Sequence, residues 1–405
     1  MAQLRGNLVV GQSGGPTAVI NASLVGVIQE ALRHDAIDNV YGMRHGIEGL
    51  LKEDLVDLRS ESAQTLERLR HTPSAALGSC RHKLSDDDYE QILRVVRAHN
   101  IRYFLYIGGN DSADTSRRLA RLAAQEEYEV RVMGIPKTVD NDLVETDHCP
   151  GHPSVARWLA VSVRDAGLDT EAIGVVDTVK VIETMGRDTG WITASTALAR
   201  ERPGDAPHLI YLPERPFRRE QFLADVERIY RERRHVVITV CEGLKDERGQ
   251  YVAASTGAID TDRFGHPQLG GVAAVLCSII AGEIGIKARF DKPGTIQRVS
   301  SVLASPVDAE EAYRVGQVAV AHAVQGESGF MVSIVREPGP VYRSTTGRVP
   351  LEKVANAVKK VPDEFIADEG NDVTPAYLDY IGPLTGGPLP PYARLSGVPV
   401  AKQLV

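Results

Sequence analysis

The stretch IRYFLYIGGNDSADTSRRLARLAAQEE (101–127) contains the pattern on which the fold class depends. The mostly apolar residues 101–107 predict a buried strand, and Gly108 and Gly109 predict a sharp turn after it. Polar residues that can cap a helix follow, and apolar residues then recur at helical spacing. A glycine turn between strand and helix is typical of phosphate binding, because bare backbone N–H groups can approach an anion. Asp111, a carboxylate at the mouth of this turn, is therefore a feature that requires an explanation.

The same alternation of strand and helix recurs along most of the chain. Strands separated by helices of this length predict an α/β fold with parallel sheets and right-handed crossovers. Ligands of such sheets bind beyond the carboxyl ends of the strands. The predicted strands are 8–10, 101–107, 130–135, 173–179, 208–213 and 235–240, and the predicted helices are 18–33, 86–100, 110–127, 154–167, 187–200, 220–234 and 271–285.

The length of 405 residues predicts two domains of ordinary α/β size. A Pro/Gly-rich break, HCPGHPS (148–154), marks a boundary between them. We expect a first domain over 1–153, completed by part of 299–360, and a second over 154–298. The Pro/Gly-rich segment 361–405 predicts an irregular tail packed on the body or on a partner subunit.

Composition excludes several classes of protein. The formal net charge is −8, which argues against a nucleic-acid binder with a basic face. The 4 cysteines are scattered without a C-x-x-C pair, as expected for reduced thiols in a cytosol. The first residues, MAQLRGNLVVGQSGG, contain no apolar core long enough for a signal peptide, and no apolar run reaches membrane-spanning length. We therefore expect a cytoplasmic protein with neither a nucleic-acid nor a membrane partner.

A second glycine turn, GQSGGPT (11–17), also joins a predicted strand to a predicted helix. It suits a phosphate, and a tight structural turn is the alternative of nearly equal weight. It lacks the spacing of the dinucleotide fingerprint, since Val19 and Ile20 stand where further glycines would be needed. It lacks the G-K-[ST] of a P-loop as well.

PKTVDND (136–142) places Asp140 and Asp142 at the end of a predicted strand. In an extended segment, residues two apart point the same way, so both carboxylates are expected to face one reacting centre. One could take a proton from an attacking hydroxyl while the other holds a metal or orients the base. The alternative is an ordinary Asx-rich turn. The buried strand before it and Lys137 favour the catalytic interpretation.

Three later loops carry groups suited to a sugar phosphate. In VIETMGRDTGW (181–191), Gly186 allows close backbone approach and Arg187 offers a fixed fork for phosphate, with pairing to a surface acid as the alternative. In VITVCEG (237–243), Glu242 at a strand end could accept hydrogen bonds from sugar hydroxyls. RFDKPGTIQR (289–298) adds three cations, for which a solvated face and a phosphate site are equally good interpretations; these are Arg289, Lys292 and Arg298.

Seven motifs together resemble the phosphofructokinase family, in the family's order and from about residue 8 to about residue 300. They are SGGPTAVINAS (13–23), LGSCR (77–81), IGGNDS (107–112), PKTVDND (136–142), ETMGR (183–187), VCEG (240–243) and GTIQR (294–298). The resemblance implies two Rossmann-like domains with the active site in the cleft between them. It also implies Mg²⁺-dependent phosphoryl transfer to the 1-hydroxyl of fructose 6-phosphate.

The resemblance assigns roles residue by residue. Asp140 is the implied catalytic base, Asp142 its acidic companion, and Thr138 helps to hold the transferred group. Arg289 corresponds to an arginine that reaches into the neighbouring subunit's site, which implies a homodimer or homotetramer. A second arginine of that kind has no clear match, and Thr178 or Lys180 stands near its place. The other implied substrate-binding residues are Gly14, Gly15, Arg81, Gly109, Met185, Gly186, Arg187, Glu242 and Arg298.

Departures from the ATP-using pattern indicate the phosphoryl donor. ATP-using members have glycine where this chain has Asp111 and Lys137, and this pair resembles the pyrophosphate-dependent branch. Asn110 stands where an aspartate usually offers a ligand to Mg²⁺, so the expected metal ligands are Asn110 and Asp142. The preferred interpretation is transfer from pyrophosphate to fructose 6-phosphate, with sedoheptulose 7-phosphate as another possible acceptor. An ATP-dependent phosphofructokinase and a non-catalytic regulatory subunit of the same fold are the alternatives.

Overall fold

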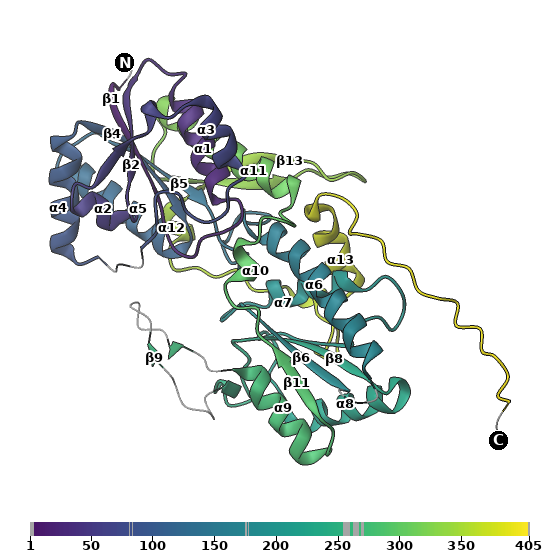
Figure 1. Ribbon diagram of the computed structural model, residues 1–405. Helices are drawn as coiled ribbons and strands as arrows, with labels where there is room; N and C mark the ends of the chain where they lie inside the picture. Colours follow the sequence, from purple (N-terminus) through teal and green to yellow (C-terminus); the bar gives the residue numbers. More distant parts are fainter. Residues whose placement is uncertain are drawn as a thin grey trace.

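The computed structural model describes residues 4–80, 82, 84–174, 176, 178–253, 260–261, 267–268 and 271–403. Figure 1 shows two α/β domains that lie side by side, with α6 (His152–Ala172) between their sheets. The α/β class agrees with the alternation of strands and helices in the sequence, and the two domains agree with the chain length. Within the described ranges, no helix is long and apolar enough to cross a membrane.

The larger domain is built on a sheet with the strand order β13-β12-β5-β4-β1-β2-β3. The five inner strands are parallel, and the two edge strands, β3 and β13, run antiparallel to their neighbours. The strands are β1 (Gly6–Gln12), β2 (Ile37–Met43), β3 (Leu55–Asp57), β4 (Ile101–Gly108), β5 (Arg131–Pro136), β12 (Phe330–Arg336) and β13 (Ser344–Pro350). Two of these strands thus come from after residue 299 and complete the larger sheet.

Helices cover both faces of this sheet, because its central strands bury apolar side chains on alternate sides. In β1, Leu8 and Val10 pack against one layer and Val9 against the other. The first layer consists of α1 (Ile20–Ala31), α3 (Ala63–Arg70) and α11 (Pro306–Val324). The second consists of α2 (Ile47–Leu51), α4 (Asp86–Ala98), α5 (Asn110–Gln125) and α12 (Leu351–Val354).

The smaller domain has a parallel sheet with the order β11-β6-β8-β7. Helices α8 and α9 pack on one face, and α6 with η2 on the other. The elements are β6 (Val179–Thr184), α7 (Trp191–Ser195), η2 (Thr196–Ala199), β7 (Leu209–Tyr211), α8 (Arg219–Arg233), β8 (Val236–Cys241), α9 (Val272–Glu283), β11 (Ala288–Asp291) and α10 (Ile296–Val299). β9 (Asp260–Thr261) and β10 (Pro267–Gln268) pair antiparallel in a separate two-stranded sheet.

Two sequence predictions differ from the structure in this region. The strand predicted at 173–179 is wrong, because α6 extends to Ala172 and the strand β6 begins at Val179. The apolar residues that follow the helix have the composition of a short buried strand, and composition alone does not separate the two. The helix predicted at 187–200 begins at Trp191, since residues 187–190 form a loop that faces the other domain.

The segment 361–385 contains short helices, whereas an irregular tail was expected for 361–405. It forms η4 (Asp363–Phe365), α13 (Pro375–Ile381) and η5 (Gly382–Thr385). Its apolar side chains share a buried cluster with Trp191 and with strand β7 of the smaller domain. Burial against that domain stabilises short helices that would be marginal alone. After η5 the described chain has neither helix nor strand. Its first part lies along α6, where Arg157 Nη1 donates to the Gly387 carbonyl at 3.0 Å and the Tyr392 hydroxyl donates to Asp165 Oδ1 at 2.6 Å. Figure 1 shows the C-terminus itself away from the body.

Candidate active site

A cavity of about 300 Å³ lies between the two domains. It sits beyond the carboxyl ends of β1, β4 and β5, and the loop that follows β6 lines it on the side of the smaller domain. β1 is paired with β4 on one side and β2 on the other, so the order of the strands reverses there, which is where open parallel sheets bind ligands. The lining residues are Ser13, Gly14, Gly15, Gly109, Asn110, Asp111, Ser112, Lys137, Thr138, Asp140, Asp142, Arg187, Asp188, Thr189 and Val358.

Two glycine turns form one wall of the cavity. Gly14 adopts φ +73°, a conformation that other residues rarely adopt. A Cβ at Gly15 would lie 2.7 Å from Nη1 of Arg298, so the bare backbone lets this guanidinium approach. The Lys137 side chain, which is buried, donates from Nζ to the Gly15 carbonyl at 3.1 Å. A cationic, backbone-lined wall of this kind suits phosphate.

Asp140 and Asp142 both line the cavity, but not because the chain is extended. Asn141 between them adopts φ +55°, so the chain bends and the period of two does not apply. The bend is held by the Asp140 N–H, which donates to Thr138 Oγ1 at 3.1 Å, and by Thr189 Oγ1, which donates to the Asp140 carbonyl at 3.1 Å. Both carboxylates line the same cavity, as the prediction that they face one reacting centre requires. The extended backbone that was expected to bring them there is wrong.

The acidic pair has perturbed ionisation. Burial, with Asp142 and then Glu242 nearby, raises the pKa of Asp140 to about 7, although Lys137 and Arg187 lower it. Burial likewise raises the pKa of Asp142, which a hydrogen bond from Thr138 opposes. A carboxylate with a pKa near neutrality can accept a proton and return it.

Asn110 and Asp142 form a possible cation site. Asn110 Nδ2 donates to Asp142 Oδ2 at 3.2 Å. Asn110 Oδ1 and Asp142 Oδ1 are both buried and have no hydrogen-bond partner within the part of the chain that the structure describes. Two orphaned oxygen acceptors, one of them charged, fit a hard divalent cation such as Mg²⁺. No cluster of three or more His, Cys, Asp or Glu is found among the described residues, so other ligands would come from substrate or water.

Asp111 is exposed in the first turn of α5 at the cavity. The helix begins at Asn110 with Gly109 as its N-cap, and no described side chain makes a capping hydrogen bond there. A Cβ at Gly108 would lie 2.0 Å from Ser112 Oγ, so this turn requires glycine. Asp111 is the second residue of the helix, so it does not stand at the N-cap position.

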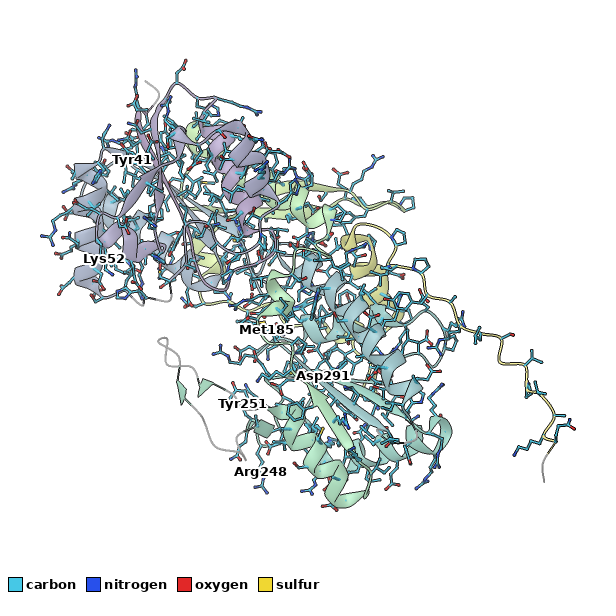
Figure 2. All side chains as sticks on the ribbon, viewed as in Figure 1. Tyr41, Lys52, Met185, Arg248, Tyr251 and Asp291 are labelled. Carbon is cyan, nitrogen blue, oxygen red and sulfur yellow. The ribbon has the colours of Figure 1, made fainter. Side chains whose placement is uncertain are left out.

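The loops after β6 and β8 meet at the smaller domain's side of the cleft. Gly186 has φ +120°, and its N–H donates to Glu242 Oε1 at 3.3 Å. Burial raises the pKa of Glu242, while Lys292 lowers it. The Met185 N–H donates to Gln297 Oε1 at 3.1 Å, which ties this loop to α10. Figure 2 shows Met185 at the junction of the two domains.

The basic residues predicted for substrate binding lie at different distances from the cavity. Arg298 reaches the glycine turn at Gly15, next to the cavity. Arg289 is exposed on β11 and is not among the described residues that line the cavity. Lys180, considered for the second arginine's role, pairs with Asp291 at 3.0 Å. Arg81 lies outside the described residues.

Several residues that line the cavity received no role from the sequence. Ser13 and Ser112 stand inside the motifs SGGPTAVINAS and IGGNDS, and Asp188 and Thr189 follow Arg187. Their position in or next to the motifs was the available signal. Val358 comes from a distant part of the chain, and only packing brings it to the cavity.

Comparison with known proteins agrees with the geometry. The phosphofructokinase family profile matches residues 7–323. The chain belongs to the phosphofructokinase family. It is similar to the family member named pyrophosphate--fructose 6-phosphate 1-phosphotransferase in Xanthomonas campestris pv. campestris, with 43% identity over 98% of both chains. A protein of the same name in Halomonas elongata is 43% identical over 98% of this chain and 96% of its own.

A solved structure of the family has the same fold. The crystal structure of a pyrophosphate-dependent phosphofructokinase from Marinobacter aquaeolei superposes with a TM-score of 0.86 and 40% identity, and the match covers 98% of each chain. The two Rossmann-like domains expected from the resemblance are therefore confirmed.

Proposed function

We propose that the protein transfers a phosphoryl group reversibly from pyrophosphate to the 1-hydroxyl of fructose 6-phosphate. The observation that carries the proposal is one cavity that holds two glycine turns, the Lys137 ammonium and the Asp140 carboxylate. The full-length similarity to proteins named for this reaction supports the choice of substrates. Asp111 and Lys137 at the donor side support pyrophosphate over ATP.

Phosphoryl transfer needs positioning and charge stabilisation more than covalent chemistry from the protein. Asp140 is the proposed base that accepts the proton of the sugar hydroxyl, a role that suits its raised pKa. Lys137, Thr138 and Arg187 are proposed to bind the transferred phosphoryl group. Mg²⁺, held by Asn110 and Asp142, would supply positive charge to the phosphate oxygens.

The two domains are proposed to bind different substrates. Residues 1–153, with part of 299–360, would bind the donor through the glycine turns, and residues 154–298 would bind the sugar phosphate through Glu242 and the loop after β6. Arg289 is exposed outside the cavity, which supports a role in a neighbouring subunit's site and hence a homo-oligomer.

A donor assay with a base variant tests the proposal. Fructose 6-phosphate and Mg²⁺ are supplied with either pyrophosphate or ATP, and formation of the bisphosphate is measured. Activity with pyrophosphate is expected, and Asp140→Asn should lower kcat by roughly 10²–10⁴-fold with little change in KM. Turnover with ATP alone would indicate the ATP-dependent alternative, and no turnover with either donor would indicate a regulatory subunit. Near-normal turnover of Asp140→Asn would remove Asp140 from the role of base.

A further inference from the structure

We infer that Tyr380, on the C-terminal helix α13, is a positioning residue that holds the loop carrying Asp140 and Asp142 in its working shape. The inference rests on the function proposed above. α13 belongs to the part of the chain whose sequence carries no recognisable chemistry. Tyr380 does not line the cavity within the described residues, so it acts through the loop and does not touch substrate.

Asn141 is the residue through which Tyr380 reaches the loop. Its side chain is fully buried, and its backbone is in the left-handed conformation that separates the two aspartates. Asn141 Nδ2 donates to the Tyr380 hydroxyl at 3.0 Å, and Asn141 Oδ1 accepts from the Cys149 N–H at 2.9 Å. Both ends of this amide are thus anchored outside the bend. Because the left-handed conformation is unfavourable for a residue with a side chain, such anchors are needed to keep it populated.

The Tyr380 hydroxyl also contacts the loop at Asp147. It donates to the Asp147 carbonyl at 2.8 Å, so one phenol bridges Asn141 and Asp147. Burial raises the pKa of Tyr380 well above its ordinary value, which keeps the donating proton in place. Removal of this single oxygen would leave the buried donor at Asn141 without its partner. It would also remove one of the two hydrogen bonds that the Asp147 carbonyl accepts, the other coming from Lys359 Nζ.

Tyr380 is itself held rigidly. Its ring stacks on Phe365 with the centroids 5.4 Å apart and contacts Trp191 at 5.5 Å. The Arg336 guanidinium lies 4.9 Å from the centre of the ring and donates to the Tyr380 carbonyl at 2.9 Å. A group fixed in this way can transmit the position of α13 to the loop.

Lys359, a partly buried lysine that precedes α13 in the chain, supports the loop as well. The Lys359 N–H donates to the Asp142 carbonyl at 2.7 Å. Lys359 Nζ donates to the carbonyls of Thr146 and Asp147 at 3.0 and 2.9 Å. The segment that follows the larger domain therefore wraps the loop on the side of Asp142 and on the side of Asp147.

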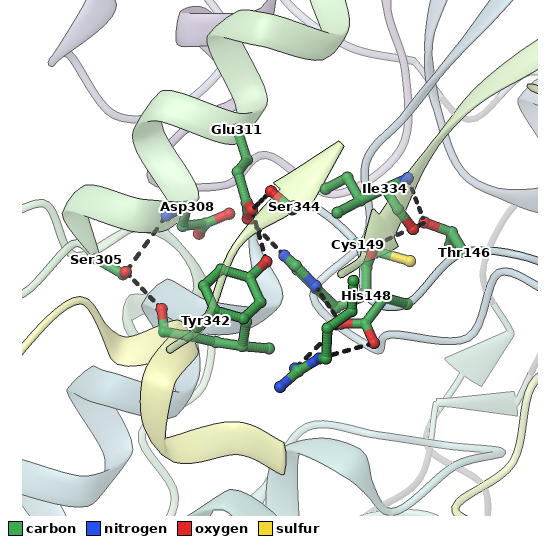
Figure 3. Close-up of polar contacts among 12 residues, drawn as sticks. Thr146, His148, Cys149, Ser305, Asp308, Glu311, Ile334, Tyr342 and Ser344 are labelled. Atoms are coloured by element: carbon green, nitrogen blue, oxygen red, sulfur yellow. Dashed lines mark hydrogen bonds and ion pairs between the residues drawn. The ribbon is translucent and has the colours of Figure 1, made fainter. Parts of the chain in front are cut away.

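The far end of the loop is fixed independently of Tyr380. Figure 3 shows Thr146 bonded to Ile334, whose N–H donates to Thr146 Oγ1 at 2.9 Å. It also shows His148 next to Glu311, with 2.7 Å between Nε2 and Oε2. Loss of the Tyr380 hydroxyl should therefore loosen the bend at Asn141 while the end of the loop stays attached to the larger domain.

Tyr380→Phe tests the inference, with Tyr377→Phe as the matched control. Tyr377 lies on the same helix, is fully buried and donates from its hydroxyl to the Trp191 carbonyl at 2.9 Å. Both variants lose one buried hydroxyl, and only one of them loses the link to the loop. We expect Tyr380→Phe to lower kcat by about 10- to 100-fold with both KM values within about twofold, because small misplacement of a reacting group is costly. Tyr377→Phe should keep kcat within about twofold of the wild type.

Two further measurements separate positioning from general damage. Amide hydrogen exchange at Cys149, whose N–H is bonded to Asn141, should accelerate in Tyr380→Phe and not in Tyr377→Phe. Asn141→Gly keeps the left-handed backbone accessible and removes the same anchor, so adding Tyr380→Phe to it should lower kcat no further.

The inference is overturned if Tyr380→Phe keeps wild-type kcat and exchange, or if both tyrosine variants lose kcat equally. A wild type that is inactive with pyrophosphate would overturn the proposed function instead. The exchange comparison would then still decide whether Tyr380 positions the loop, because it needs no turnover.

Discussion

The donor choice gives the sharpest prediction, because it concerns one exposed carboxylate. Pyrophosphate ends where ATP continues into an α-phosphate and adenosine, and Asp111 lies at the cavity wall formed by the first turn of α5. We predict that Asp111→Gly raises kcat/KM for ATP relative to pyrophosphate. Two like charges about 4 Å apart repel by about 1 kcal/mol in water and by about 4 kcal/mol at an effective dielectric constant near 20.

The exposure of Asp111 places the expected effect in the lower part of this range. Repulsion of about 1 kcal/mol corresponds to about fivefold, so a gain of about 5- to 30-fold in the preference for ATP is expected. Lys137 has the opposite role, since its ammonium is buried against Gly15. Truncation of a buried charge partner costs about 2 kcal/mol or more, so adding Lys137→Gly should lower kcat/KM for pyrophosphate by about 30-fold or more.

The assay measures kcat/KM for both donors in the wild type, the single variants and the double variant. Asp87→Gly is the matched control, because Asp87 is also an exposed aspartate at the second position of a helix, α4, and does not line the cavity among the described residues. Asp111→Asn separates the charge from the volume of the side chain. An unchanged donor ratio in the double variant, or an equal gain in Asp87→Gly, would refute the exclusion of nucleotide by Asp111.

Two more predictions concern assembly and pH. If Arg289 serves a neighbouring subunit's site, mixing Asp140→Ala protein with Arg289→Ala protein should restore part of the activity through hybrid oligomers, and no recovery after verified subunit exchange would contradict a shared site. Asp147 and Glu311 raise the pKa of the buried His148 against the opposing effect of burial. The stabilisation that protonated His148 gives to the folded protein is therefore complete at pH values below its pKa in the unfolded chain, near 6.5. It is lost as the pH rises through the higher pKa that His148 has in the folded protein. Denaturant unfolding measured across this pH range should show a free energy of unfolding that falls as the pH rises, and His148→Gln should flatten that fall. The same pH dependence in His148→Gln as in the wild type would contradict this role of His148.

The fold class was readable from the sequence because its signal is local. In residues 101–127, the apolar run, the two glycines and the helical spacing each report on neighbours in the chain, and the structure has β4, the turn and α5 there. The strand predicted at 173–179 failed for the same reason. A short apolar run looks alike at the end of a helix and in a strand, and the pairing that distinguishes them is made by distant segments.

The candidate site was partly readable because its groups cluster in short motifs. Asp140, Asp142 and Lys137 lie within six residues of one another, and all three line the cavity. The raised pKa of Asp140 was not readable, since it depends on burial and on Glu242 from the other domain. Ionisation is a property of the assembled environment, whereas residue type is a property of the chain.

By itself, the sequence determined the α/β alternation, the glycine turns and the residue types of the site, since each depends on backbone preference or side-chain chemistry within a few positions. Only the tertiary structure decided how the acidic pair is presented. The left-handed bend at Asn141 is held by Tyr380, 239 positions away along the chain. That contact forms because α13 buries its aromatic side chains against the smaller domain. Burial of this kind depends on the whole folded chain, and no pattern near Asp140 encodes it.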